Sequence, residues 1–364
     1  MRIAFYGSSL LSSYWNGAAT YYRGLLSALA ALGYHITFFE SDAFDRQSHR
    51  DIEMPDWARV QVYPASESGV HDVVEQASLA DVVVKASGVG VYDDELLEGV
   101  MAAARPSAIR IFWDVDAPAT LSEITPQPNH PLRRVLGQLD LVLTYGGGKP
   151  VVAAYRALGA ARCVPIYNAL DPATHYPVPR QVGLAADLVF LGNRLPDRET
   201  RVDQFFLGPA ATLPKRSFLL AGSGWHDKPI PTNVRLLGHV GTSQHNALNS
   251  SALAVLNIAR DSMAAVGFSP ATRVFEAAGA GACIITDAWE GIEMFLKQDE
   301  EILVARDAQD VAQHIGALAP SRAAEIGLRA QSRILAEHTY ARRAVLVDKL
   351  LRETLSARRT AAVA

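Results

Sequence analysis

The sequence predicts an α/β protein made of two doubly wound domains that face a cleft. Three observations support this prediction. The 364 residues are enough for two domains of ordinary size. Short β-rich runs alternate with longer helical patterns, and the alternation stops at a proline-rich stretch and then restarts. Several of the β-rich runs are continuously apolar, which is typical of parallel strands that are buried on both faces.

The first half is predicted to begin with a strand at residues 2–6 and a helix over residues 18–32 that stops at Gly33. Residues 168–180 contain three prolines and few helix formers, so we interpret them as a linker. The remaining strands of this half are expected at residues 36–39, 60–63, 81–85, 109–113, 141–144 and 164–166.

The second half repeats the same plan and ends in helical sequence over residues 321–356. The helical pattern weakens near residues 338–340. We therefore predict a first domain at residues 1–180, a second at 181–335, and a terminal helical segment at 336–364. Ligands of open parallel sheets bind beyond the carboxyl ends of the strands, so functional residues should follow strands and face the cleft. The strands of this half are expected at residues 188–191, 218–221, 234–237, 254–257, 283–286 and 302–304.

Composition excludes several classes of protein. With 49% hydrophobic and 20% charged residues, the chain is neither disordered nor collagen-like, and its net charge of −4 argues against a nucleic-acid partner. Cys163 and Cys283 lie in apolar runs, which favours buried free thiols in a reducing compartment. The apolar run at residues 1–7 is too short for a signal peptide, and no stretch has the length of a membrane span. We expect a cytoplasmic protein without a transmembrane segment.

Three segments of the first half follow predicted strands. The glycine- and serine-rich loop at residues 7–17 suits contact with a phosphate or an acceptor, or serves as a helix cap. Asp114 and Asp116 follow a strand and can hold a metal, act as a base or orient an acceptor hydroxyl, although such pairs often only cap helices. Residues 145–150 do not complete a P-loop because Pro150 follows the lysine.

The first two loops of the second half offer polar and glycine residues. Arg194 and Arg198, beside Asn193, suit a diphosphate at a helix start, although a solvated charged loop would look the same. The loop after the next strand holds Gly222, Ser223 and Trp225. Its glycines permit close approach of a ligand, and the indole ring could stack on a base or a sugar or pack at the rim.

The segment with the most candidate binding residues covers residues 257–279 and includes Arg260. Ser269 followed by proline predicts a helix start, whose free N–H groups form an anion site. Arg273 and Glu276 lie three residues apart on that helix, and the carboxylate can accept hydrogen bonds from a ribose diol. The simpler interpretation is a surface ion pair with a modest effect.

Taken together, these segments resemble GT-B glycosyltransferases, which contain two Rossmann-like domains, and among them the CgeB-like proteins near the group 1 glycosyltransferases. The likeness is good from about residue 186 onward and weaker before it, where residues 113–121 (WDVDAPATL) match best. The matching segments are residues 256–260 (LNIAR), 273–281 (RVFEAAGAG), 284–287 (IITD), 300–305 (EEILVA) and 338–343 (HTYARR), the last like the start of a terminal helix that crosses back to the first domain.

The resemblance implies a glycosyltransferase, of the hexosyltransferase class, that takes its sugar from a nucleotide-diphosphate sugar. Glu276 would bind ribose, and Arg194 or Arg198 would meet the diphosphate with help from the helix start at Ser269. The acceptor, a glycan, small molecule or protein, would lie near Asp114 and Asp116. The arginines would replace a metal, so no metal and no cofactor besides the nucleotide-sugar co-substrate is expected.

One residue departs from the family pattern: Phe268 stands where many group 1 enzymes carry the first of two glutamates eight residues apart. Alternatives therefore stay open. They are a nucleotide-sugar epimerase of the same architecture, a non-catalytic binding protein for nucleotide sugars, and a metal-dependent transferase built on the two aspartates.

Overall fold

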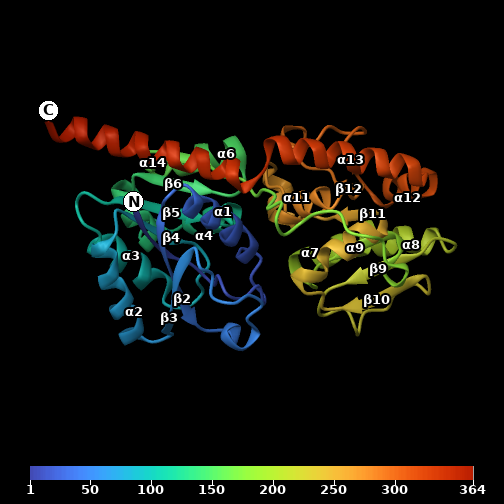
Figure 1. Ribbon diagram of the computed structural model, residues 1–364, viewed down its shortest axis with the longest axis horizontal. Helices are drawn as coiled ribbons and strands as arrows, with labels where there is room; N and C mark the ends of the chain where they lie inside the picture. Colours follow the sequence, from blue (N-terminus) through green and yellow to red (C-terminus); the bar gives the residue numbers. More distant parts are fainter. Residues whose placement is uncertain (364) are drawn as a thin grey trace. The chain divides into compact units, whose positions relative to one another are not determined.

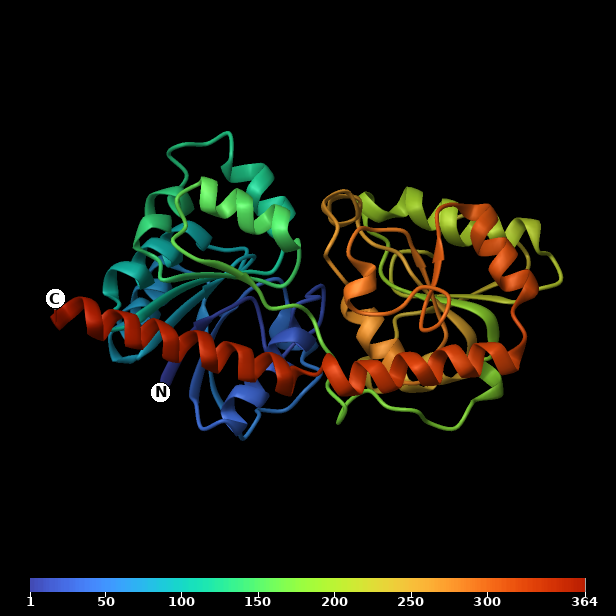
Figure 2. The same ribbon diagram turned by 90° about the horizontal axis from the view of Figure 1, so that it is seen from above.

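The computed structural model describes residues 1–363, which form two α/β units. Unit 1 comprises residues 1–167 together with the chain from residue 340 onward, and unit 2 comprises residues 168–339. In each unit a parallel sheet carries helices on both of its faces (Figures 1 and 2). This arrangement confirms the predicted fold class.

The sheet of unit 1 is fully parallel and has the strand order β3-β2-β1-β4-β5-β6-β7. Its central strands are buried on both faces, as their apolar runs predicted. Its strands are β1 (Arg2–Tyr6), β2 (His35–Asp42), β3 (Ala58–Pro64), β4 (Val82–Ala86), β5 (Ile109–Asp114), β6 (Leu141–Thr144) and β7 (Cys163–Pro165).

The helices of unit 1 join consecutive strands, and the last one returns from unit 2. The first ends where predicted, because Gly33 has a φ of +88° and the N–H of Tyr34 bonds back to the carbonyl of Leu29. The helices are α1 (Ala19–Ala31), α2 (Glu67–Val74), α3 (Asp93–Ala103), α4 (Ala117–Ile124), α5 (Pro131–Val135), α6 (Gly148–Ala157) and α14 (Tyr340–Val363). Short 3-10 turns occupy Arg46–His49, Glu75–Leu79 and Leu136–Gln138.

The sheet of unit 2 repeats this topology with the order β10-β9-β8-β11-β12-β13. Numbered within the unit, the order is 3-2-1-4-5-6, which is that of a dinucleotide-type doubly wound sheet. The strands are β8 (Ala186–Leu191), β9 (Phe218–Ala221), β10 (Val234–Gly238), β11 (Ala252–Asn257), β12 (Ile284–Asp287) and β13 (Leu303–Ala305).

The helices of unit 2 include α7 and α8, which continue into one another through a π-helical turn at Asp203–Leu207. The helices are α7 (Pro196–Val202), α8 (Gly208–Thr212), α9 (His245–Ser251), α10 (Asp261–Val266), α11 (Thr272–Gly279), α12 (Ala308–Ala317) and α13 (Pro320–Glu337). Short 3-10 turns occupy Val182–Leu184, Thr242–Gln244 and Ile292–Met294.

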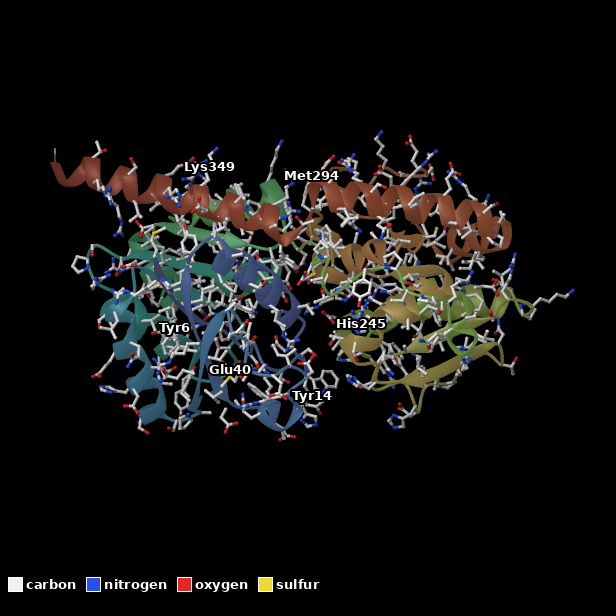
Figure 3. All side chains as sticks on the ribbon, in the orientation of Figure 1. Tyr6, Tyr14, Glu40, His245, Met294 and Lys349 are labelled. Carbon is white, nitrogen blue, oxygen red and sulfur yellow. The ribbon has the colours of Figure 1, made fainter. Side chains whose placement is uncertain are left out.

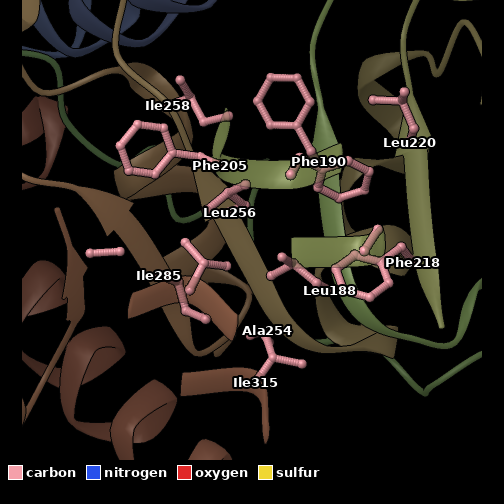
Figure 4. Close-up of a cluster of buried hydrophobic side chains, with 14 of the residues drawn as sticks. Leu188, Phe190, Phe205, Phe218, Leu220, Ala254, Leu256, Ile258, Ile285 and Ile315 are labelled. Carbon is pink, nitrogen blue, oxygen red and sulfur yellow. The ribbon is translucent and has the colours of Figure 1, made fainter. Parts of the chain in front are cut away.

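The core of unit 2 lies between its sheet and the helices that follow β8 and β13. Phe190, Phe206 and Phe218 pack there with ring centroids 5.5–6.2 Å apart, in contact with aliphatic side chains of β11 and β12 (Figure 4). The upper part of this cluster, at Phe190, lies at the carboxyl end of β8. The core therefore supports the edge of the sheet at which ligands of this topology bind.

The division between the units falls at residues 167/168 and 339/340, where the sequence predicted 180/181 and 335/336. Residues 168–181 are irregular, as expected of a linker, but they pack on unit 2. The N–H of Val178 bonds to Ser250 Oγ at 3.2 Å, and the N–H of Gln181 bonds to Ser251 Oγ at 2.9 Å. The C-terminal helix α14, by contrast, belongs to unit 1. It packs on α1 (red and blue in Figure 1), where the ring of Tyr340 fills the space above Gly24.

Side chains along α14 attach it to the rest of unit 1. Asp348 accepts a hydrogen bond from Tyr34 Oη at 2.7 Å, and the guanidinium group of Arg358 forms two bonds of 2.7 Å with Asp140. Both cysteines are buried free thiols, as predicted. Among the described residues, no helix combines the length and the apolar character that a membrane crossing requires.

Candidate functional site

The carboxyl ends of β8, β11 and β12 form the edge of the unit 2 sheet where the strand order reverses direction. In such sheets this switch point is the position at which ligands bind. Asp287, at the end of β12, is fully buried and accepts hydrogen bonds from the N–H of Ala259 and from Arg201 Nη2. These bonds fix the loop after β11 at the sheet edge.

The loops after β8 and β9 are tied together by short hydrogen bonds. Asn193 Oδ1 accepts a bond of 2.9 Å from the N–H of Ser223, and Trp225 Nε1 donates one of 2.8 Å to the carbonyl of Gly192. Gly222 has a φ of +123°, and a Cβ there would lie 2.3 Å from the carbonyl oxygen of Gly192. Glycine is therefore required for this backbone contact. Trp225 is only 2% exposed, so it anchors the loop and has no free face for a base or a sugar.

Two arginines converge on the first of these loops. A Cβ placed on Gly192 would lie 3.0 Å from Arg198 Nη2 and 3.2 Å from Arg273 Nη2. Both guanidinium groups also lie over the ring of Phe190, at 5.6 Å and 5.0 Å from its centroid. Helix α7 supplies one arginine and helix α11 the other, so the pair exists only in the folded unit.

Neither arginine of this pair forms an ion pair with a carboxylate among the described residues. Arg198 donates one bond of 2.6 Å from Nη2 to the carbonyl of Asn193, and its Nε is buried without a partner. Burial and the neighbouring Arg198 lower the pKa of Arg273 to about 9. Burial also lowers the pKa of Arg198. Two guanidinium groups that lack an ion-pair partner at a sheet edge are a candidate site for an anion.

The other two predicted arginines are already neutralised. Arg194 bonds to Glu199 at 2.8 Å and to Asp227 at 2.9 Å. Arg260 forms an ion pair with Asp197. Of the two arginines that the sequence proposed for the diphosphate, Arg198 is therefore the one without a carboxylate partner, and Arg273 of the neighbouring helix joins it.

The predicted helix start at Ser269 is wrong, because α11 begins at Thr272 with Ala271 as its N-cap. Ser269 bonds instead to the carbonyl of Gly267 at 3.0 Å, which stabilises the preceding turn. Phe268 has a φ of +49° and donates its N–H to the carbonyl of Glu290 at 2.6 Å. A Cβ on Gly291 would lie 2.2 Å from the Phe268 ring, so glycine makes room for this residue.

Glu276 lies one turn after Arg273 on α11 and faces two histidines that the sequence analysis did not single out. Its carboxylate oxygens are 3.8 Å from His175 Nε2 and 3.9 Å from His245 Nδ1 (His245 is labelled in Figure 3). Its side chain is 13% exposed. The two histidines come from the proline-rich segment and from the start of α9, and no spacing pattern in the sequence joins them to Glu276.

In unit 1, the side chain of Asp114 is fully buried and accepts hydrogen bonds from donors of the same unit. Oδ1 accepts bonds from Ser87 Oγ, Thr120 Oγ1 and the N–H of Asp116, and Oδ2 accepts one from Tyr155 Oη. Burial raises the pKa of this carboxyl group, while these bonds act in the opposite direction. Asp114 therefore positions the loop after β5, and Asp116 is the member of the pair that reaches a cavity.

That cavity has a volume of about 420 Å³ and lies beyond the carboxyl ends of β4 and β5. Its walls include Asp116, Thr120, His130 and the ion pair of Lys85 with Asp93. The predicted phosphate loop at residues 7–17 is less open than expected, because Glu40 accepts the N–H groups of residues 10 and 11 (Glu40 is labelled in Figure 3).

A family model described as glycosyl transferase-like matches residues 198–349, which include both Arg198 and Arg273. A search of curated protein sequences found no match.

Solved structures share the architecture over nearly the whole chain. Sucrose-phosphate synthase from Thermosynechococcus elongatus has a TM-score of 0.71 at 15% identity, covering 98% of this chain and 100% of that one. Anabaena HepE, in complex with UDP and glucose, has a TM-score of 0.67 at 16% identity and the same coverage. An alpha-glucosyltransferase in complex with UDP and DNA has a TM-score of 0.71 at 12% identity, covering 97% and 99%. The chain therefore has the GT-B fold, with two Rossmann-like units.

Proposed function

We propose that this protein is a glycosyltransferase that moves a sugar from a nucleotide-diphosphate sugar to an acceptor. We further propose that the sugar is a hexose. The proposal rests above all on Arg198 and Arg273, two guanidinium groups without carboxylate partners that converge on Gly192 at the switch point of unit 2. The finer assignment to the CgeB-like branch rests on the sequence resemblance alone.

A nucleoside diphosphate meets the requirements of this site. Its phosphate oxygens would supply the negative charge that the two arginines lack, through charge-assisted hydrogen bonds. Its ribose diol would donate to Glu276, one helical turn from Arg273. The HepE and alpha-glucosyltransferase structures are complexes with UDP or UDP-glucose, which supports a donor of this class.

The chemistry follows from the same residues. When the bond between sugar and diphosphate breaks, negative charge grows on the leaving group. Guanidinium groups that already lie in place stabilise that charge without reorganisation. A divalent metal at the diphosphate is therefore not required in this proposal. Asp116, at the cavity of unit 1, is proposed to orient or deprotonate the acceptor hydroxyl.

The first experiment is a thermal-shift and calorimetric panel with UDP, GDP, dTDP, CDP and ADP in the presence of EDTA. A ligand at 100 times its Kd stabilises the folded protein by about 2.7 kcal/mol. We expect one nucleoside diphosphate to raise the melting temperature selectively. If none does so, and none binds by calorimetry, the donor site and the proposed activity are both wrong.

Replacement of Glu276 tests the ribose contact. We expect Glu276→Ala to weaken binding of that nucleotide by about 10-fold to 150-fold, because hydrogen bonds to a charged acceptor contribute about 1.5–3 kcal/mol. The control is Glu293→Ala, which removes an exposed glutamate of the same unit. Equal affinities of the two variants would remove Glu276 from the site.

Incubation with the matching nucleotide sugar separates transfer from the alternatives. A transferase consumes the donor in the presence of an acceptor, or hydrolyses it slowly in water. An epimerase inverts the sugar without an acceptor, and a binding protein returns the donor unchanged. Mass spectrometry and NMR of the recovered sugar distinguish these three outcomes.

A further inference from the structure

The cluster of His175, His245 and Glu276 in unit 2 has the composition of a metal site. One nitrogen from each imidazole and one carboxylate oxygen all lie within 4.8 Å of one another. His175 is 6% exposed, and the side chains of His245 and Glu276 are 16% and 13% exposed. The two imidazole rings are tilted by 42° with centroids 6.0 Å apart.

The inward nitrogens of this cluster have no hydrogen-bond partner. His175 Nε2 and His245 Nδ1 are both buried and unpaired, although the Glu276 oxygens are only 3.8 Å and 3.9 Å away. A buried polar atom without a partner carries a free-energy cost, which a bound ion or ligand removes. The gaps are too wide for direct hydrogen bonds. The ligand atoms of a tetrahedral ion with bonds of about 2.0–2.1 Å lie about 3.3 Å apart, so side-chain rotations that draw the three groups together by about 0.5–1.5 Å would complete the coordination.

The surroundings hold His175 in position. Asn246 accepts the N–H of Tyr176 at 3.2 Å and donates to the carbonyl of Thr174 at 2.8 Å, so it holds the chain on both sides of His175. The second nitrogen, His175 Nδ1, lies 2.9 Å from Thr174 Oγ1. Metal-binding histidines usually have their other nitrogen fixed in this way.

Packing against α11 places the segment of His175 beside Glu276. A Cβ on Gly279 would lie 2.4 Å from Leu170 Cδ1 and 3.0 Å from the carbonyl oxygen of His175. Glycine at this position thus allows the segment to approach the helix one turn after Glu276.

Charge in the cluster is compatible with a divalent ion. The carboxylate of Glu276 supplies one negative charge close to the two imidazole rings. Arg273 opposes a cation, and the carboxylate of Glu276 compensates for it. Two histidines and one carboxylate are a preferred ligand set for zinc, with a fourth position left for water.

We propose that His175, His245 and Glu276 form a site for a divalent transition metal of the zinc type. The site is separate from the arginine pair, but it uses the carboxylate to which the proposed function assigns the ribose. If that function is correct, zinc and the nucleotide exclude each other, and zinc inhibits the enzyme.

Cobalt and zinc titrations of the full-length protein, freed of metal by EDTA and dialysis, test the site without any nucleotide. We expect one equivalent of Co²⁺ to bind with a visible ligand-field absorption that Zn²⁺ displaces. His175→Asn, His245→Asn and Glu276→Gln should each weaken binding at least about tenfold, whereas the exposed His71→Asn in unit 1 should not.

The metal site is wrong if no saturable binding occurs, or if all three variants bind like the wild type while their circular dichroism shows that they are folded. A zinc-induced rise in melting temperature, lost in His245→Asn, provides a second measurement on the same variants.

Nucleotide affinity with and without zinc separates this inference from the proposed function. We expect zinc to weaken nucleoside diphosphate binding in the wild type but not in His245→Asn. That comparison also controls for chelation of zinc by the nucleotide in solution. Metal binding without this antagonism would support the metal site and contradict the ribose contact of Glu276. Absence of nucleotide binding in EDTA would contradict the proposed function and leave the metal titration unaffected.

Discussion

Replacing Arg273 with methionine should change stability and ligand affinity in opposite directions. The side chain is partly buried in unit 2 beside Arg198 and without an ion-pair partner, and its pKa is lowered to about 9. One tenfold change in a protonation equilibrium corresponds to about 1.4 kcal/mol. The charged form therefore destabilises the ligand-free protein by at most about 5 kcal/mol.

Part of that cost is offset by the contact of the guanidinium group with Phe190, which contributes about 1–2 kcal/mol. Methionine keeps a long side chain over the ring and removes the charge. We expect Arg273→Met to stabilise the ligand-free protein by about 1–3 kcal/mol, a rise of about 2–4 °C in melting temperature for each kcal/mol.

The same change should weaken binding of the nucleoside diphosphate by about 10-fold to 150-fold, because a charge-assisted hydrogen bond contributes about 1.5–3 kcal/mol. Calorimetry measures this loss, and differential scanning fluorimetry measures the melting temperature. The exposed Arg306 provides a matched control, since Arg306→Met changes neither an anion site nor a buried charge. A lower melting temperature with unchanged affinity would refute the reasoning and make Arg273 a structural residue.

The pH dependence of stability has a defined sign. Because the pKa of Arg273 is lower in the folded state, the unfolded chain binds more protons between about pH 9 and pH 12.5. The penalty is fully present below pH 9 and declines as the pH rises through this window. In denaturant titrations, the free energy of unfolding of the wild type should therefore gain a stabilising contribution as the pH rises above 9. Arg273→Met should lack this contribution.

Two further variants test the packing of the loops. Gly192→Ala places a methyl group 3.0–3.2 Å from the guanidinium groups of Arg198 and Arg273. We expect this variant to bind the nucleoside diphosphate about tenfold more weakly, as measured by calorimetry. Gly183→Ala, which has open space around the added methyl group, should bind like the wild type. Asp114→Asn presents an amide to donors that include Tyr155, so it should lower the free energy of unfolding by about 2–4 kcal/mol in denaturant titrations. The exposed Asp72→Asn should stay within about 0.5 kcal/mol of the wild type, and an equal effect of the two changes would contradict the role of Asp114 as a buried acceptor.

Sequence reasoning located the strand ends of both sheets to within two residues, except for the end of β2, which lies three residues beyond the predicted one. Buried parallel strands require apolar runs, and these are visible in the chain. Sequence reasoning also located the end of α1 at Gly33, where a positive φ favours glycine. The start of α11 was misplaced by two to three residues, because the serine–proline pair forms a turn before the helix. Local preferences are thus reliable where one residue type is physically required and weaker where two conformations satisfy the same pattern.

The candidate site was predicted in part. Glu276, Arg198 and Arg273 were among the proposed residues, and the structure shows why the last two differ from Arg194: Glu199 and Asp227 neutralise Arg194. Whether an arginine is paired depends on side chains from other loops, and a single sequence does not reveal that arrangement.

The sequence by itself determined the alternating α/β plan and the residue types at the ends of the strands, because both follow from local hydrophobicity and backbone preferences. Only the tertiary structure decided which of those residues meet. His175 and His245 lie far apart along the chain and reach Glu276 through the hydrogen bonds of Asn246 and the close packing at Gly279. Such long-range contacts arise from packing of the whole unit, and they determine which charges remain free to bind a ligand.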